Sequence, residues 1–116
     1  MVTVSIVIPA KNEAGNIAAL VDEIDLACRG KAEYEVIVVD DRSDDDTAKV
    51  VQGLMADRSH LRLVQHDRSG GQSAAVNSGV RVARGQIICT LDGDGQNPPM
   101  ELPKLFLPLL APENAA

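Results

Sequence analysis

Short apolar runs alternate along the chain with stretches in which apolar residues recur every three or four positions. Four runs predict β-strands, at Val4–Ile8, Glu35–Asp40, Leu61–His66 and Ile87–Asp92. The segment between the first two predicts a helix with one apolar face, formed by Ile17, Leu20, Val21, Ile24 and Cys28. This alternation is typical of βα units on a parallel sheet, and strands this apolar are expected to be covered on both faces.

Three further helices follow from their end signals and inward faces. The run Ser43 to Asp46 predicts caps for a helix with an inward face of Val50, Val51 and Leu54. The segment Gln72 to Arg84 has a face of small residues that permits close approach to the sheet, made of Ala75, Val76, Gly79, Val80 and Ala83. Gly85 is predicted as its left-handed stop. Pro98 and Pro99 suit the start of a helix through Leu110. The predicted fold is therefore α/β, a Rossmann-like, mostly parallel sheet with helices on both faces in the order βαβαβαβα.

Composition narrows the function classes. The 116 residues suit one domain, and their 45% hydrophobic and 24% charged content is that of a soluble globular protein. One Tyr and one Phe cannot build stacking platforms for single-stranded nucleic acid. The net charge of -6 would repel a phosphate backbone, so no nucleic-acid partner is expected. An anionic substrate would need a cation brought to its site.

The cysteines and termini predict the compartment. Cys28 and Cys89 lie about sixty residues apart without CxxC spacing, which indicates two free thiols in a reducing compartment. The apolar N-terminus is too short for a signal peptide and lacks a basic leader, and Lys104 and Pro108 interrupt the longest apolar stretch. We expect a cytoplasmic protein without a membrane span.

Polar residues follow three of the predicted strands. They occupy positions 9–13 (PAKNE), 40–42 (DDR) and 92–97 (DGDGQN). In parallel α/β sheets, ligands bind beyond the carboxyl ends of the strands. We therefore expect these three segments to converge on one rim.

The most informative segment is Asp92-Gly93-Asp94. Two carboxylates separated by a glycine can present hard oxygens to Mg²⁺ or Mn²⁺, and Gln96 could add a neutral oxygen. The metal would neutralise a diphosphate on this acidic protein. Taken alone, an isolated DxD is more often a solvated acidic turn than a metal site.

Other candidates are weaker. Asp40 could accept a hydrogen bond from a nucleobase or ribose, or cap the following helix, and capping by Ser43 to Asp46 would leave it free. The amides of the Gly70-Gly71 turn could receive phosphate or a base, or form a plain turn. Walker, GxGxxG and GxSxG motifs are missing, and His60 and His66 fit structural or solvated roles.

Four segments together carry a resemblance to a known family. They are SIVIPAKNE, EVIVVDDRSDDDT, SGGQSAAVNSGVRVARG and LDGDGQNPP, in this order and spacing. They resemble family 2 glycosyltransferases of the GT-A fold, and most closely the dolichol- or polyprenyl-phosphate sugar transferases. The match runs from about Ser5 to Leu110.

The resemblance implies roles for particular residues. Pro9, Asn12 and Glu13 match a nucleotide-binding segment, and Asp40, with Asp41 beside it, matches the carboxylate that recognises the base. Arg68 and Gln72 lie on the loop that lines the nucleotide pocket. Asp92 and Asp94, with Gly93 between them, match the DxD motif that holds the divalent metal and the sugar-nucleotide diphosphate. The implied ligands of Mg²⁺ or Mn²⁺ are therefore Asp92, Asp94 and Gln96. The implied partners are a UDP- or GDP-linked sugar and a polyprenyl-phosphate acceptor.

The chain also departs from the family. Members continue with strands that carry acceptor-site and catalytic residues, so residues 1–116 are expected to be the donor-binding part of a truncated GT-A domain, peripheral to the membrane's cytoplasmic face in a longer parent. Glu101 and Glu113 suit helix-start and tail charges, so no catalytic base is assigned. The apolar last helix favours a homodimer or contact with the segments that follow in the family. The alternatives are a noncatalytic nucleotide-binding or assembly module and, more remotely, a receiver-like signalling domain.

Overall fold

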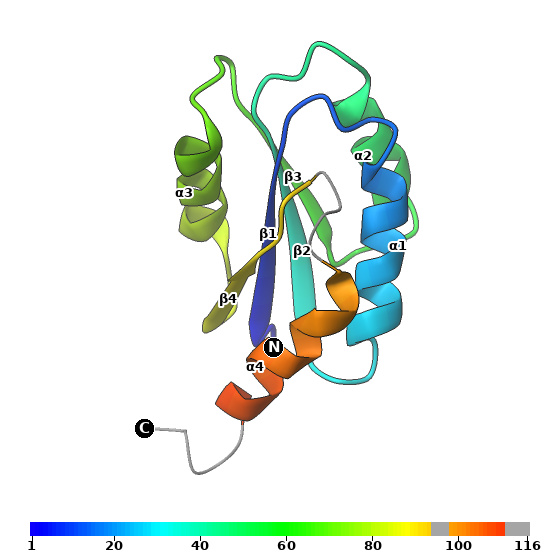
Figure 1. Cartoon of the computed structure of the whole chain (residues 1–116), viewed down its shortest axis with the longest axis vertical. Helices are drawn as coiled ribbons and strands as arrows, with labels where there is room; N and C mark the ends of the chain where they lie inside the picture. Colours follow the sequence, from blue (N-terminus) through cyan, green and yellow to red (C-terminus); the bar gives the residue numbers. More distant parts are fainter. Residues whose placement is uncertain (94–97, 111–116) are drawn as a thin grey trace.

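The computed structural model describes residues 1–93 and 98–110. Its elements are β1 (Val4–Ala10), α1 (Ile17–Cys28), β2 (Tyr34–Asp40), α2 (Thr47–Met55), β3 (Leu61–Gln65), α3 (Gln72–Val82), β4 (Ile87–Thr90), the 3₁₀ turn η1 (Pro99–Glu101) and α4 (Leu102–Leu110) (Figure 1). These elements confirm the predicted βαβαβαβα order. Strand and helix ends differ from the predicted ones by a few residues.

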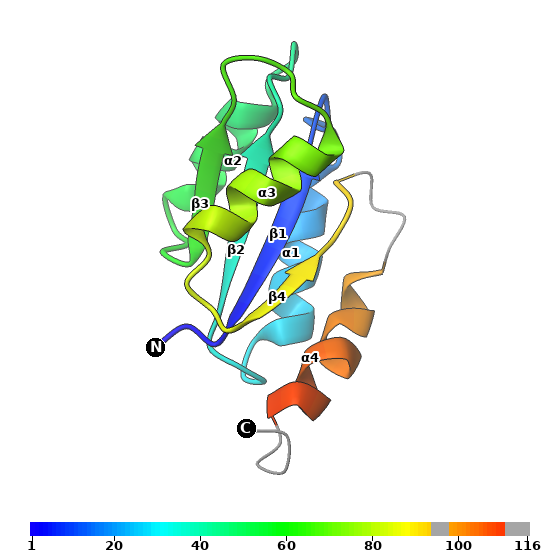
Figure 2. The same cartoon turned by 90° about the vertical axis from the view of Figure 1, so that its left-hand side faces the viewer.

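The four strands form one parallel sheet in the order β3-β2-β1-β4 (Figure 2). In the register, Val4 is opposite Tyr34 and Ile87, and Ala10 is opposite Asp40. Because all strands run the same way, their carboxyl ends meet at one edge of the sheet, as predicted. The receiver alternative has the order 2-1-3-4-5, which differs from this one.

Helices cover both faces unequally, with α1, α2 and α4 on one side and α3 on the other (Figure 1). The larger core lies on the three-helix side, where β1 and β2 contribute their even-numbered residues and α4 contributes Leu102 and Phe106. The odd-numbered residues Val7, Ile37 and Val39 face α3. This alternation is the two-residue period of a strand, and it decides which side each residue beyond a strand end faces.

The close approach predicted for α3 rests on one glycine. A Cβ at Gly79 would lie 2.4 Å from Cγ1 of Val7 and 3.3 Å from Cγ2 of Val39. Ala75 is fully buried beside it, whereas Val80, predicted inward, is 40% exposed. The small-residue face is therefore narrower than the sequence indicated.

The prediction for Gly85 was wrong. The helix ends at Val82, and the next residue, Ala83, is extended. Gly85 does not have the positive φ of a left-handed stop. A Cβ at Gly85 would instead lie 2.8 Å from the backbone nitrogen of Ser5. The glycine is needed because the chain passes directly against β1.

A buried carboxylate secures this end of α3. Glu35 is 2% exposed and accepts hydrogen bonds from the Ser5 hydroxyl (2.6 Å), the Arg62 guanidinium (2.8 Å) and the Arg84 amide (2.7 Å). Burial would raise the pKa of Glu35, but these bonds hold it below its ordinary value. The network lies at the amino ends of the strands, opposite the carboxyl ends where parallel α/β sheets generally bind ligands.

Coverage of the sheet is incomplete at the β4 edge. The expectation of two covered faces holds for β1 and β2, whereas Ile88 of β4 is 39% exposed. In α4, Leu105 and Leu109 are also exposed. Cys28 and Cys89 are buried free thiols, as predicted. Among residues 1–93 and 98–110, no helix has the length and apolarity needed to cross a membrane.

Candidate functional site

A cleft of about 360 Å³ opens at the carboxyl ends of the strands, between β1, β4 and the start of α3. Its described wall combines the ends of three strands with the loop that leads into α3. The residues that line it are Pro9, Ala10, Lys11, Glu13, Asp41, Ser69, Gly71, Gln72, Ala75, Asp92 and Gly93. The predicted convergence of the segments after β1, β2 and β4 is therefore present.

Strand alternation selects which acidic residues reach the cleft. Asp41 continues the side of β2 that faces α3, and Asp92 holds the equivalent position beyond β4. Asp40 continues the opposite side, toward α1 and α2. Of the two neighbouring carboxylates, Asp41 is in the described cleft wall and Asp40 is not.

Asp41 anchors the loop that enters α3. One carboxylate oxygen accepts hydrogen bonds from the Gly70 amide (2.8 Å) and His66 Nδ1 (2.8 Å), and the other from the Gly71 amide (2.9 Å) and the Ser69 hydroxyl (3.0 Å). Burial opposes the charge, but these four bonds hold the pKa of Asp41 well below its ordinary value. The amides of Gly70 and Gly71, which the sequence offered to a ligand, are thus used by the protein itself.

Asp40 has a comparable role in the turn between β2 and α2. It is 4% exposed, and its Oδ1 accepts bonds from the amide (3.0 Å) and hydroxyl (2.5 Å) of Ser43. The expectation that Asp40 is left free was wrong, because Ser43 bonds Asp40 itself. The start of α2 is instead bonded by Asp45, which accepts from the Thr47 amide at 3.0 Å. Base recognition by Asp40 stays a prediction.

Asn12 joins the turns that follow β1 and β2. It has a left-handed backbone (φ 57°), its amide donates to Ser43 Oγ (2.9 Å), and its side-chain oxygen accepts from the Asp44 amide (2.8 Å). Next to it, the Glu13 amide donates to Thr47 Oγ1 at 2.9 Å. Asn12 therefore shapes the rim, and within the described cleft wall its neighbours Lys11 and Glu13 are the lining residues.

Asp92 lies across the cleft at the end of β4. Its Oδ1 accepts a hydrogen bond from the Gln72 side chain at 2.9 Å, and within the described part of the chain no donor bonds its Oδ2. Gly93 is packed against β1, since a Cβ there would lie 3.1 Å from the Pro9 carbonyl oxygen. A glycine is therefore favoured beside Asp92 by the close packing against β1 as well as by the turn that the sequence predicted.

The predicted metal ligands are only partly within the described chain. Asp94 and Gln96 lie outside the described residues, as does Glu113. Among residues 1–93 and 98–110, no three His, Cys, Asp or Glu side chains are grouped to hold a metal. Asp92 could bind a divalent cation through its Oδ2, which no described residue bonds.

The structure thus brings most of the predicted site residues together. Six line the cleft: Pro9, Glu13, Asp41, Gln72, Asp92 and Gly93. Arg68 is exposed and stays outside the described cleft wall. Sequence reasoning did not select Lys11 or Ser69, although the two-residue period that places Pro9 and Asp41 toward α3 also places Lys11 there.

Both histidines have structural partners. His60 Nε2 lies 2.7 Å from Oδ1 of Asp25, and His66 joins Asp41 to Ser78 Oγ, which is 2.7 Å from its Nε2. The Ser78–His66–Asp41 order resembles a hydrolase triad, but Ser78 lies inside α3, where backbone amides bond within the helix and cannot form an oxyanion hole. The arrangement ties α3 to the sheet.

The family model for glycosyl transferase family 2 matches residues 5–116, nearly the whole chain. The chain belongs to glycosyl transferase family 2. This family 2 chain is 43% identical over 104 residues to an undecaprenyl-phosphate 4-deoxy-4-formamido-L-arabinose transferase of Pseudomonas fluorescens, and 40% identical to one of Aeromonas hydrophila. The first alignment covers 88% of this chain and 30% of the relative, the second 88% and 32%. The chain therefore spans about a third of the length of these relatives.

Solved structures show the same fold. A mannosyltransferase from Pyrobaculum calidifontis in complex with GDP-Man and Mn²⁺ superposes with a TM-score of 0.81 at 29% identity, over 94% of this chain and 32% of that one. Glucosyl-3-phosphoglycerate synthase from Mycobacterium tuberculosis, in complex with Mn²⁺, UDP and glucosyl-3-phosphoglycerate, gives 0.73 at 28% identity, over 94% and 40%. The predicted GT-A architecture is confirmed.

Proposed function

We propose that this chain is the donor-binding part of a glycosyltransferase that moves a sugar from a UDP- or GDP-linked donor to a polyprenyl phosphate by metal-dependent inverting displacement. The observation that carries the proposal is the cleft, in which Asp92 faces the loop leading into α3 at the carboxyl ends of the strands. Ligands of open α/β sheets bind at this edge.

The cleft suits a nucleoside diphosphate in size and polarity. Its volume of about 360 Å³ falls within the range of small-molecule sites. At the start of α3, Gln72 adds a polar side chain to the cleft wall, while the Asp41 carboxylate already binds the amides of Gly70 and Gly71. Structural relatives hold GDP-Man or UDP together with Mn²⁺, which supports the same class of ligand here.

A divalent metal would lower the electrostatic cost of that ligand. Glu13, Asp41 and Asp92 make the described wall acidic, and a diphosphate adds further negative charge. We assign Mg²⁺ or Mn²⁺ to Asp92, Asp94 and Gln96, in line with the oxygen ligands these ions prefer. The bound metal would screen the diphosphate, while Gln72 orients Asp92 through its 2.9 Å bond.

The acceptor is proposed from the relatives. They are named undecaprenyl-phosphate 4-deoxy-4-formamido-L-arabinose transferases, which supports a polyprenyl-phosphate acceptor for the whole protein. Because the chain spans about a third of their length, we expect it to bind donor better than it catalyses transfer. The exposed leucines of α4 are assigned to contacts with the rest of the whole protein or with a second copy.

The test is isothermal titration of UDP and GDP with and without Mn²⁺. We expect one of them to bind in Mn²⁺, and EDTA or Asp92→Ala to remove the metal-dependent part. Asp67→Ala, at an exposed carboxylate outside the described cleft wall, is the matched control. Absence of binding by both nucleotides, or unchanged metal dependence in Asp92→Ala, would refute the proposal.

A noncatalytic nucleotide-binding or assembly module is the alternative that this test leaves open. It predicts the same binding, but no transfer activity when the chain forms part of the whole protein. Assay of sugar transfer by the full-length protein therefore separates the two functions.

A further inference from the structure

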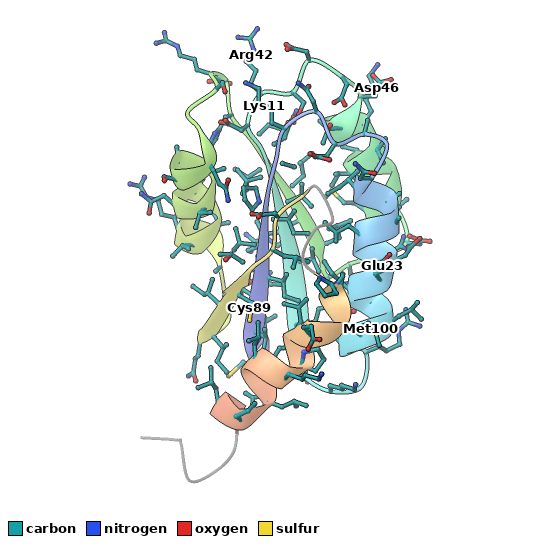
Figure 3. The ribbon with its side chains drawn as sticks, viewed as in Figure 1. Lys11, Glu23, Arg42, Asp46, Cys89 and Met100 are labelled. Carbon is teal, nitrogen blue, oxygen red and sulfur yellow. The ribbon has the colours of Figure 1, made fainter. Side chains whose placement is uncertain are left out.

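Lys11 is the cation of the described cleft wall. It is the first residue after β1, on the side of the sheet that faces α3, and its ammonium donates to Ser69 Oγ at 2.7 Å. Figure 3 shows Lys11 at the same end of the molecule as Arg42, beyond the strand ends. Arg42 and Arg68, by contrast, stay outside the described wall of the cleft.

The ammonium of Lys11 keeps binding capacity. A lysine side chain has three donor hydrogens, and the described contacts of Lys11 use one of them, toward a neutral hydroxyl. Within the described part of the chain, Lys11 makes no ion pair, unlike Arg58, Arg62 and Lys104. The nearby carboxylate of Asp41 is engaged by four donors and reaches Lys11 only through Ser69.

The backbone on both sides of Lys11 is held in place. Before it, Ala10 is paired with β2 and accepts a bond from the Asp41 amide at 2.9 Å, and after it, Asn12 is fixed by bonds to Ser43 and Asp44. The partner Ser69 is itself bonded to Asp41 at 3.0 Å. A flexible side chain thus extends from a rigid base into an acidic cleft, which suits a cation that moves from a hydroxyl to an incoming anion.

We propose that Lys11 binds the phosphoryl oxygens of the donor nucleotide and adds a second positive charge to that of the metal. The proposal rests on the nucleotide-binding function above and deepens it by naming a donor-affinity residue at the end of β1. On binding, the ammonium leaves Ser69 or shares its donors between Ser69 and the phosphate. No covalent step is involved.

The test compares Lys11→Met and Lys11→Arg with wild type, and uses Lys31→Met as the control. Lys31 is exposed and follows α1, at the opposite end of the sheet. The titrations are done in Mg²⁺, which is diamagnetic, and are followed by ¹⁵N NMR so that weak binding is measured and folding is verified. They use the preferred nucleoside diphosphate and the corresponding unphosphorylated nucleoside.

We expect Lys11→Met to weaken diphosphate binding about ten- to hundred-fold, the range for a lost charge-assisted hydrogen bond, and to change nucleoside binding less than about two-fold. Lys11→Arg should retain most of the affinity, and Lys31→Met all of it. Equal losses for diphosphate and nucleoside, or no loss in Lys11→Met, would overturn the assignment while the proposed function stands. If wild type binds neither ligand, the proposed function fails, and the role of Lys11 fails with it.

Discussion

The carboxylate of Asp41 is predicted to determine the stability of the loop that forms one side of the cleft. The perturbation is Asp41→Asn, which preserves shape and removes charge. In the wild type, each carboxylate oxygen accepts two of the four bonds. An asparagine can keep one oxygen toward two donors, but its NH₂ group then faces the remaining amide and the Ser69 hydroxyl.

The magnitude follows from that mismatch. The Ser69 hydroxyl can rotate and accept a bond, whereas a backbone amide cannot, so one amide of Gly70 or Gly71 loses its acceptor. Gly70 and Gly71 are exposed, but their amides bond the buried Asp41 carboxylate, and losing a hydrogen bond to a charged group costs about 1–3 kcal/mol. With an m-value of about 1.5 kcal/mol/M, the urea midpoint should fall by about 0.7–2 M.

The assay is equilibrium urea denaturation of wild type, Asp41→Asn and Asp67→Asn. Asp67 lies in the same connection between β3 and α3, but its side chain is exposed and accepts no hydrogen bond within the described residues. We expect no change for Asp67→Asn. An Asp41→Asn midpoint equal to that of wild type would refute the anchoring role derived from the four bonds.

Acid titration gives an independent readout. Because the pKa of Asp41 is lower in the folded protein than in the unfolded chain, its stabilising effect is fully present above the unfolded value of about 3.9. The effect is lost as the pH falls below that value toward the folded pKa. The stability difference between wild type and Asp41→Asn should therefore shrink between about pH 5 and pH 2, and a constant difference would contradict this linkage.

Three further predictions concern the core. Gly79→Ala should lower the free energy of unfolding by about 1–3 kcal/mol in urea melts because its Cβ would overlap Val7, whereas Gly53→Ala, with open space around it, should be neutral or stabilising. Glu35→Ala should cost about 1–3 kcal/mol, measured the same way, because the Ser5 hydroxyl and the Arg84 amide lose their acceptor, whereas Arg62 keeps its bond to the Val82 carbonyl; a loss below about 1 kcal/mol would contradict the buried network. Burial raises the pKa of Cys28 to about 11, so iodoacetamide should modify it slowly at pH 8 until denaturant is added; rapid native labelling would be inconsistent with its burial.

Much of the fold could be predicted because the spacing of apolar residues determines which segments form strands or helices and which of their faces are buried. The apolar runs of β1 and β2 are covered on both faces, and the three- and four-residue spacing of α1 matches its buried face. Gly85 shows the limit of local reasoning. A glycine after a helix predicts a left-handed stop, but the contact that requires it is with Ser5, eighty residues earlier in the chain.

The candidate site was predicted in outline for the same reason. Strand ends in a parallel sheet converge whatever their residues are, so the segments after β1, β2 and β4 could be assigned to one edge. The roles of individual polar groups could not, because they depend on bonds between loops. Asp40 was expected to be free on the ground that Ser43 to Asp46 could cap α2, yet Ser43 bonds Asp40 itself.

The two consecutive carboxylates at the end of β2 explain how loop structure and ligand binding are divided. Strand alternation sends Asp40 to the turn before α2 and Asp41 to the turn before α3, so one strand end supports the turns on both faces. The proposed function assigns the ligand contacts to the ends of β1 and β4, where Lys11 and Asp92 keep donors and acceptors that no described residue uses. Substitution at these two positions should therefore change donor affinity with little loss of stability, whereas substitution of Asp41 should change both.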